Sequence, residues 1–174
     1  AGTSAFIGDA IAPLLRGVWK NVRAVATTDI VTNAADYLVA DKPLLLISFA
    51  RSGNSPESVA AVNLANAICK NVAHIYITCN KNGHLAQSAN AENILSLLLP
   101  EETDDKSLAM TSSFSTMLLT CLMISQIDHI EAERERIEAV AANAQAVLSD
   151  YAGAIEAIAA RPFERGVFLG SGPM

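Results

Sequence analysis

The chain is 174 residues long, which is enough for one domain with a substantial core. Hydrophobic residues make up 51% of it, charged residues 17% and aromatic residues only 5%. This mixture suits helices packed on a buried parallel sheet. The formal net charge of −6 argues against a nucleic-acid surface, which needs clustered Lys and Arg, but not against a small anion bound by backbone amides.

The three cysteines, Cys69, Cys79 and Cys121, form no CxxC pair and have no histidine at metal-ligand spacing. We therefore expect buried thiols in a reducing cytoplasm, with no metal and no cofactor. Residues 107–127 are the most membrane-like stretch of the chain. They carry many Ser and Thr side chains, so a loop followed by a buried helix is the better interpretation, and no membrane partner is expected.

The first part of the chain alternates between helical and strand patterns. Apolar residues at Ile7, Ile11 and Leu14 recur at helical spacing. Residues 44–49 form a continuous apolar run between turn residues, which predicts a central, buried strand. In chain order we expect a helix over 6–17, a strand over 22–26, a helix over 30–38, a strand over 44–49 and a helix over 57–70.

The second part continues the alternation and then becomes helical. Pro162 is expected to end the last long helix. The expected elements are a strand over 72–78, a helix over 84–89, a strand over 92–97, helices over 113–130 and 131–160, and a strand over 167–169. Repeated alternation of strand and helix favours a three-layer α/β fold, with a parallel sheet between two layers of helices.

At both ends of the chain, the sequence pattern is that of a connection between a strand and a helix of an α/β fold. Residues 1–4 read as a loop entering a helix, and an α/β fold would place a strand before such a loop. Residues 166–174 read as a strand entering a Gly/Ser turn. We therefore expect a segment of a longer protein that lacks its leading strand. The similar Gly-Thr-Ser and Gly-Ser-Gly turns at residues 2–4 and 170–172 would fit two copies of one domain.

The stretch with the clearest chemistry is residues 48–58, between the strand over 44–49 and the next helix. Ligands of open α/β sheets bind at the carboxyl ends of strands, where helix N-termini favour phosphate. The hydroxyls of Ser52 and Ser55 suit phosphate oxygens, Gly53 permits close backbone approach, and Arg51 adds a positive charge. An ordinary serine-capped turn is the alternative. The stretch is neither a Walker loop nor a dinucleotide fingerprint.

Three motifs, in this order along the chain, resemble the SIS (sugar isomerase) domain family. Residues 51–58, Arg-Ser-Gly-Asn-Ser-Pro-Glu-Ser, resemble its phosphate loop. Residues 1–4, Ala-Gly-Thr-Ser, resemble its first sugar-contacting loop, and residues 109–114, Ala-Met-Thr-Ser-Ser-Phe, resemble the loop that opens a long helix. The pattern is most similar to bacterial tagatose-6-phosphate ketose/aldose isomerases, also assigned as galactosamine-6-phosphate deaminases.

The resemblance implies particular roles for the residues of these motifs. Phosphate binding falls to the stretch Arg51, Ser52, Gly53 and Ser55. Sugar binding falls to Thr3, Ser4 and Thr111. The sequence departs from the resemblance at two positions. Ser112 stands where the corresponding loop of glucosamine-6-phosphate synthase, a related enzyme, has Lys. Ala50 stands where the phosphate loops of many SIS domains have Ser.

The resemblance also implies an architecture and a set of partners. It predicts a flavodoxin-like SIS domain over residues 1–161 and the start of a second SIS domain over 162–174. The expected partners are a sugar-phosphate substrate, that second domain of the parent chain and further copies of the protein in a homo-oligomer. The expected activity is that of an aldose–ketose isomerase or deaminase of amino-sugar or keto-sugar 6-phosphates.

No catalytic residue is assigned within the segment, because relatives place the acid and base largely in the second domain or in a neighbouring subunit. His74, His84, His129 and Glu57 are interpreted as structural or surface residues. Two other functions stay open. One is a non-catalytic SIS sensor, which an upstream helix-turn-helix would reveal, and the other is an unrelated flavodoxin-like domain, which bound flavin would reveal.

Overall fold

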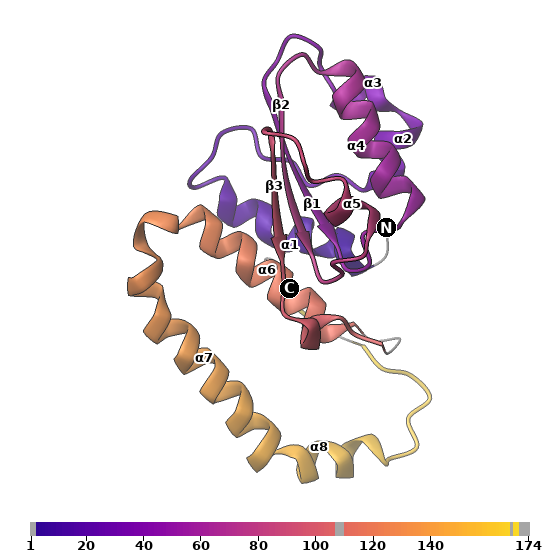
Figure 1. The fold of residues 1–174 in the computed structure, drawn as a ribbon. Helices are drawn as coiled ribbons and strands as arrows, with labels where there is room; N and C mark the ends of the chain where they lie inside the picture. Colours follow the sequence, from indigo (N-terminus) through magenta and orange to yellow (C-terminus); the bar gives the residue numbers. More distant parts are fainter. Residues whose placement is uncertain (1–2, 107–109, 168, 171–174) are drawn as a thin grey trace. The chain divides into compact units, whose positions relative to one another are not determined.

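The computed structural model describes residues 3–106, 110–167 and 169–170, and the chain divides after Ser125 into two compact units (Figure 1). The first unit contains a parallel sheet with helices on both faces, which confirms the predicted three-layer α/β fold. The second unit is helical.

The sheet of the first unit has three parallel strands in the order β1-β2-β3. They are β1 (Leu44–Ala50), β2 (Val72–Thr78) and β3 (Ile94–Leu98). The middle strand β2 is buried from His74 onward. Its side chains alternate, so that Ile75 and Ile77 face one helical layer and Tyr76 faces the other.

One face of the sheet is covered by α1 (Thr3–Leu15) and α6 (Thr111–Ser125), which pack against each other (Figure 1). Their apolar residues recur at three- and four-residue spacing, so each helix presents one stripe to the sheet. The buried residues of this layer are Ile7, Ile11, Leu15, Ile75, Ile77, Cys79, Leu99, Met117 and Cys121.

The opposite face carries α2 (Thr27–Thr32), α3 (Ala34–Tyr37), α4 (Pro56–Ile68) and the short α5 (His84–Gln87). Small side chains on α4, Ala61 and Ala65, are buried and let this helix lie close to the sheet. Pro56 occupies the first turn of α4, where its fixed backbone angle suits a helix start. A short 3-10 turn, η1 (Glu101–Thr103), follows β3.

Three predictions for the first unit were wrong. Residues 22–26 are not a strand, because no strand of the described residues pairs with them. The helix expected over 30–38 is divided between α2 and α3, because Asn33 leaves helical backbone angles (φ −136°, ψ 55°). β1 lies at an edge of the described sheet instead of at its centre, and only Ala50 among its residues is fully buried.

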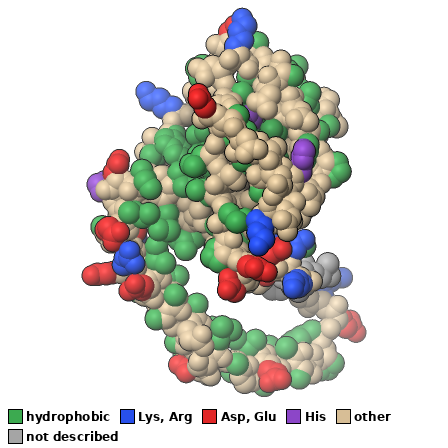
Figure 2. Space-filling model, in the orientation of Figure 1, with side chains coloured by type: hydrophobic (Ala, Val, Ile, Leu, Met, Phe, Trp, Pro, Cys, Tyr) green, Lys and Arg blue, Asp and Glu red, His purple; other side chains and the backbone are tan. Residues whose placement is uncertain are grey.

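The second unit contains η2 (Ile127–His129), α7 (Ile130–Asp150) and α8 (Ala152–Ala159). The single helix expected over 131–160 is interrupted at Tyr151, just before the poor helix former Gly153. Neither helix contains a buried residue. Figure 2 shows charged side chains grouped near the start of α7 and hydrophobic ones interspersed along both helices.

At the end of the chain, the predicted strand over 167–169 is not formed at Val167 or Leu169, and Phe168 lies outside the described residues. The predicted domain boundary at 161/162 stays a prediction. No helix in the described ranges is long and apolar enough to cross a membrane.

The burial of β2 can be tested by comparing Ile77→Ala with Leu95→Ala on β3. Ile77 is 0% exposed and Leu95 is 51% exposed. We expect Ile77→Ala to lower the free energy of unfolding by about 2–5 kcal/mol, because it removes buried contacts and leaves a cavity. Leu95→Ala should cost less than about 1 kcal/mol. Urea unfolding measures both, and equal losses would contradict the assignment of β2 as the core strand.

Candidate functional site

The loop after β1, residues 51–55, packs its backbone directly against the loop after β2. Gly53 has a φ of +66°, a conformation that side chains rarely adopt. A Cβ built on Gly53 would lie 3.4 Å from the Cα of Gly83, and a Cβ on Gly83 would lie only 2.3 Å from the carbonyl oxygen of Ser52. Gly83 therefore allows an approach that a larger residue would prevent, and Gly53 supplies the positive φ of the turn.

Hydrogen bonds from the second loop hold the first loop in place. The donors come from the end of β2 and the start of α5, and the acceptors are mainly backbone carbonyls of the first loop. The bonds are Thr78 Oγ1 to Arg51 O (3.3 Å), Cys79 N to Arg51 O (3.2 Å), Asn80 Nδ2 to Ser52 O (3.1 Å), Leu85 N to Gly53 O (3.2 Å) and His84 N to Asn54 Oδ1 (2.9 Å). The carbonyl oxygens thus face the protein.

The groups that remain in this loop are hydrogen-bond donors. The amides of Ser52, Gly53 and Ser55 donate to no other described residue. Ser55 is the N-cap of α4, yet its hydroxyl makes no capping bond. The Ser52 hydroxyl accepts from the amide of Asn54 at 3.3 Å and keeps its own proton to donate. Together with the positive end of the 13-residue helix α4, these donors suit an anion.

Arg51, predicted to bind phosphate, points its guanidinium group towards the segment after η1. Its Nη1 lies 3.5 Å from Asp104 Oδ1 and also donates to the carbonyl oxygen of Asp105. The Arg51 side chain is 28% exposed, so the pair is only partly shielded from solvent. Arg51 therefore ties the loop after β1 to the segment that leads towards α6.

The start of α6 is capped by a carboxylate. Asp105 Oδ2 accepts the amide proton of Ser113 at 2.7 Å, and this bond to the charged form is the main reason that the pKa of Asp105 lies below its ordinary value. Thr111, predicted to contact the sugar, is the first residue of α6 and is exposed. Ala109, part of the same motif, lies outside the described residues.

The remaining predicted sugar contacts, Thr3 and Ser4, form the first turn of α1. Thr3 is exposed, and Ser4 is half-buried. Ser4 lines the same groove as Ser48 and Phe49, so the start of α1 lies near the carboxyl end of β1. The structure thus brings Ser4 to the end of the strand that the loop 51–55 follows. No bond joins the predicted sugar residues to Ser52 or Ser55 among the described residues.

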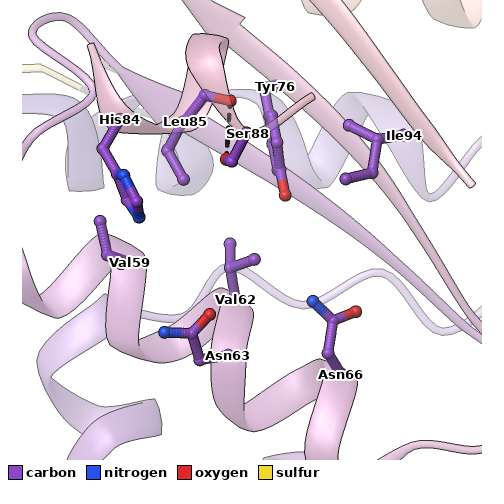
Figure 3. A pocket seen from close by; sticks show the side chains of 9 residues that line it. All are labelled: Val59, Val62, Asn63, Asn66, Tyr76, His84, Leu85, Ser88 and Ile94. Atoms are coloured by element: carbon purple, nitrogen blue, oxygen red, sulfur yellow. Dashed lines mark hydrogen bonds between the residues drawn. The ribbon is translucent and has the colours of Figure 1, made fainter. Parts of the chain in front are cut away.

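A second recess lies between α4 and α5, against β2 (Figure 3). Figure 3 shows the Tyr76 side chain extending from β2 towards α4, and its buried hydroxyl has no partner among the described protein groups. The recess has a volume of about 90 Å³, which is room for about three water molecules but not for a sugar phosphate. It is therefore not the site for such a ligand.

The histidines do not form an acid–base pair in the described structure. His74 is buried, its Nε2 lies 2.9 Å from Asn66 Oδ1, and burial lowers its pKa, so it is a neutral core residue as expected. His84 is exposed at the start of α5, and His129 is exposed in η2. No group of three His, Cys, Asp or Glu residues suited to a metal occurs in the described ranges.

All three cysteines are free and buried, as the sequence predicted. Burial raises the pKa of Cys79, and it raises the pKa of Cys121 to about 11. Both side chains are therefore protonated at neutral pH and are poor nucleophiles.

Sequence reasoning missed the residues that position the loop. Asn80 and Gly83 act on Ser52 across about thirty positions of the chain, and Asp104 and Asp105 act on Arg51 across more than fifty. The Asn-Lys-Asn-Gly turn after the second predicted strand was the available signal, because parallel strands bring the loops at their carboxyl ends together.

Replacing either glycine tests the backbone packing between the two loops. Gly83→Ala places a Cβ against the Ser52 carbonyl, so we expect the loop to move and the free energy of unfolding to fall by about 1–3 kcal/mol. The matched variant Gly53→Ala has room for its Cβ and should cost only the backbone strain, on the order of 1 kcal/mol. Urea unfolding and inorganic phosphate affinity measure the effect. If Gly83→Ala changed neither the free energy of unfolding nor the affinity for phosphate, the close packing of Gly83 against the Ser52 carbonyl would be contradicted.

The cap on α6 gives the protein a dependence on acid pH. Because the folded pKa of Asp105 is depressed, its contribution is present above the unfolded value near 3.8 and is lost as the pH falls through the folded pKa. We expect Asp105→Asn to be less stable than the parent at neutral pH, and the difference to narrow below about pH 4. Unfolding by urea across this range measures it. Parallel stability profiles for the two proteins would refute the cap.

Comparisons with known proteins agree with this geometry. The family model of the SIS domain matches residues 1–126. The D-galactosamine-6-phosphate deaminase AgaS of Escherichia coli is 51% identical over 99% of this chain, and that of Shewanella sp. (strain ANA-3) is 42% identical over 100%. The crystal structure of tagatose-6-phosphate ketose/aldose isomerase from Escherichia coli matches 99% of the chain with a TM-score of 0.84 and 48% identity.

The chain spans about half the length of these relatives, 45% of the two deaminases and 47% of the isomerase. The family match covers most of the chain, including the loop after β1 and the starts of α1 and α6. It confirms the resemblance drawn from the three sequence motifs. The chain belongs to the SIS domain family.

Proposed function

We propose that this chain is the phosphosugar-binding domain of an isomerase or deaminase acting on amino-sugar or keto-sugar 6-phosphates, of the galactosamine 6-phosphate or tagatose 6-phosphate class. The observation that carries the proposal is the loop after β1, which offers hydroxyl and amide donors beside the N-terminus of α4. The names of the AgaS deaminases and of the tagatose-6-phosphate isomerase support the substrate class.

In this proposal the phosphate binds at the loop 51–55. The hydroxyls of Ser52 and Ser55 and the amides of Ser52, Gly53 and Ser55 donate to its oxygens, and the helix dipole of α4 favours its charge. Arg51 fixes the loop through Asp104 and Asp105, and its remaining N–H groups add positive charge to the same region. Because the loop carbonyls are bound by the loop after β2, few acceptors oppose the anion.

The sugar then lies towards the starts of α1 and α6. Ser4, with Thr3 beside it, comes from the first turn of α1 at the carboxyl end of β1. Thr111 comes from the first turn of α6, which Asp105 links to Arg51. Their hydroxyls would bind sugar hydroxyl or amino groups.

The chemistry itself requires a base that moves a proton between C1 and C2 of the open-chain sugar, and a group that opens the ring. In the described structure no carboxylate and histidine are paired near the loop 51–55, so we assign acid–base catalysis to the rest of the parent chain. That part would include a second SIS domain, entered after residue 161. A homo-oligomer in the cytoplasm, with sites shared between domains or subunits, completes the proposal.

Ammonia release tests the proposal in the full-length parent protein. Galactosamine 6-phosphate is the substrate, and glucosamine 6-phosphate and unphosphorylated galactosamine are the controls. We expect release that requires both the phosphate and the galacto configuration. Conversion of tagatose 6-phosphate without ammonia release would indicate a simple isomerase, and binding without turnover would indicate a sugar-phosphate sensor.

The phosphate loop has its own test in the double variant Ser52→Ala/Ser55→Ala. Each lost hydroxyl contact should cost about 1 kcal/mol, so we expect affinity for the sugar phosphate to fall by about 30-fold with the fold intact. Ser149→Ala on α7, whose hydroxyl bonds only within its own helix, is the matched control and should bind normally. Calorimetric titration measures the affinities, and unchanged binding by the double variant would exclude the loop as the phosphate site.

A further inference from the structure

The hydroxyl of Tyr76 is a buried polar group that neither the core nor the loop 51–55 uses. Tyr76 lies on the central strand β2 and is only 1% exposed. Its hydroxyl makes no hydrogen bond to any described protein group. Buried tyrosines usually have a partner for this group, because burial without one removes a hydrogen bond to water and puts nothing in its place. The fold therefore leaves a hydroxyl here that needs a partner.

The Tyr76 hydroxyl lies in the recess between α4 and α5. Figure 3 shows the side chain entering the recess from β2, with α4 on one side and α5 on the other. The recess has a volume of about 90 Å³, so a partner for the hydroxyl must be small. Besides Tyr76, four apolar and four polar residues line it, and these are Val59, Val62, Leu85, Ile94, Asn63, Asn66, His84 and Ser88.

The polar side chains of the recess offer both donors and acceptors. Asn66 Oδ1 lies 2.9 Å from His74 Nε2, which is the donor because an amide oxygen can only accept. The Nδ2 protons of Asn66 therefore remain to donate. The Ser88 hydroxyl donates to the Leu85 carbonyl at 3.1 Å, so it offers its lone pairs. The Asn63 side chain bonds to no other described residue and offers groups of both kinds.

These groups decide the charge of the molecule that fits. The described residues that line the recess include no Asp, Glu, Lys or Arg. A cation would meet no carboxylate there, and an anion would meet no lysine or arginine. A mixture of donors and acceptors suits a small neutral molecule that both donates and accepts. Water has this chemistry, and a polar recess with several partners is where a water molecule is held.

We propose that the recess is a specific water site, in which an ordered water molecule bonds to the hydroxyl of Tyr76 and joins it to polar side chains of α4 and α5. Its other hydrogen bonds go to the amide side chains on α4 and to the hydroxyl of Ser88 at the end of α5. The recess has room for about three water molecules, so a second one can complete this path. Tyr76 is thereby linked to both helices without a direct hydrogen bond to either.

The link to α5 matters because this helix holds the loop 51–55. α5 has only four residues, and its backbone donates two of the bonds that fix that loop. They run from Leu85 N to Gly53 O at 3.2 Å and from His84 N to Asn54 Oδ1 at 2.9 Å. A water that ties the end of α5 to the central strand therefore supports the helix on which the loop rests.

A crystal structure of the unaltered full-length parent protein, at a resolution that shows ordered water, tests the site directly. We expect a water oxygen about 2.7–2.8 Å from Tyr76 Oη, with a second protein group within hydrogen-bond distance of it. A protein group bonded to the hydroxyl would overturn the proposal, and so would a recess closed by apolar side chains. Density for a larger molecule would also overturn it, because it would assign the recess to a different ligand.

The substitution Tyr76→Phe gives a second test through the sign of its effect. Removing a hydrated hydroxyl loses a hydrogen bond, so we expect the unfolding equilibrium constant of the first unit to rise by about 2- to 10-fold. Removing a dry, unpaired hydroxyl would instead lower that constant by about 5- to 150-fold. Hydrogen exchange of the β2 amides in the full-length protein measures the constant. A constant that falls or stays the same would overturn the proposal.

The matched control is Tyr151→Phe, because Tyr151 is 59% exposed and its hydroxyl is hydrated in the unfolded chain as well. This variant should leave exchange of the β2 amides unchanged. The support of α5 has its own measurement in Tyr76→Phe. The Leu85 amide reports the hold of α5 on the loop, and we expect its exchange to accelerate by a factor similar to that of Ile77 in β2. Acceleration at Ile77 with none at Leu85 would overturn the link between the water and α5.

Discussion

The approach of two backbones at the carboxyl end of the sheet is the constraint on which the candidate site depends. Gly83 lies so close to the carbonyl of Ser52 that no side chain fits between them, and Gly53 adopts a left-handed turn beside it. This packing directs the carbonyl groups of the first loop into the protein, where Thr78 and Asn80 bind them. The polarity of the loop follows, because the groups left over are amides and hydroxyls. The backbone geometry therefore makes most of the anion site. The charged side chains of Arg51, Asp104 and Asp105 hold the loop in place.

The helices α6 and α4 both begin near this edge, but only the start of α6 is capped by a side chain. At the start of α6, the carboxylate of Asp105 accepts the amide proton of Ser113, and this bond stabilises the helix. The start of α4 has Ser55 at the capping position without a capping bond, so its donors and its dipole remain available. Arg51 connects the two, since it bonds to the segment of Asp104 and Asp105 while its own backbone belongs to the phosphate loop. Arg51 therefore links the loop that precedes α4 to the segment that precedes α6.

Much of the fold was predictable because its signals are local. The run 72–78 coincides with β2, and 44–49 falls one residue short of β1, since both are apolar stretches between turn residues. The loop 51–55 was also found locally, from its hydroxyls and its place between a strand and a helix. What failed depends on distant partners. Residues 22–26 have strand-like composition, but a strand exists only where another strand pairs with it. Asn80, Gly83, Asp104 and Asp105 contribute through loops that meet only after the sheet has formed, which no short window of sequence reveals.

The three buried thiols of the first unit can be used to follow its local unfolding, because each becomes reactive only when it is exposed. Cys69 lies in the layer of α4, Cys121 lies in the layer of α6, and Cys79 follows the central strand between them. Since a thiol must leave the interior and lose its proton before it reacts, alkylation of each cysteine times the exposure of one part of the three-layer stack. The protein therefore carries a native probe in each helical layer and one at the end of the strand they enclose, and a thiol reagent can show whether the layers separate together or in turn without any label being introduced.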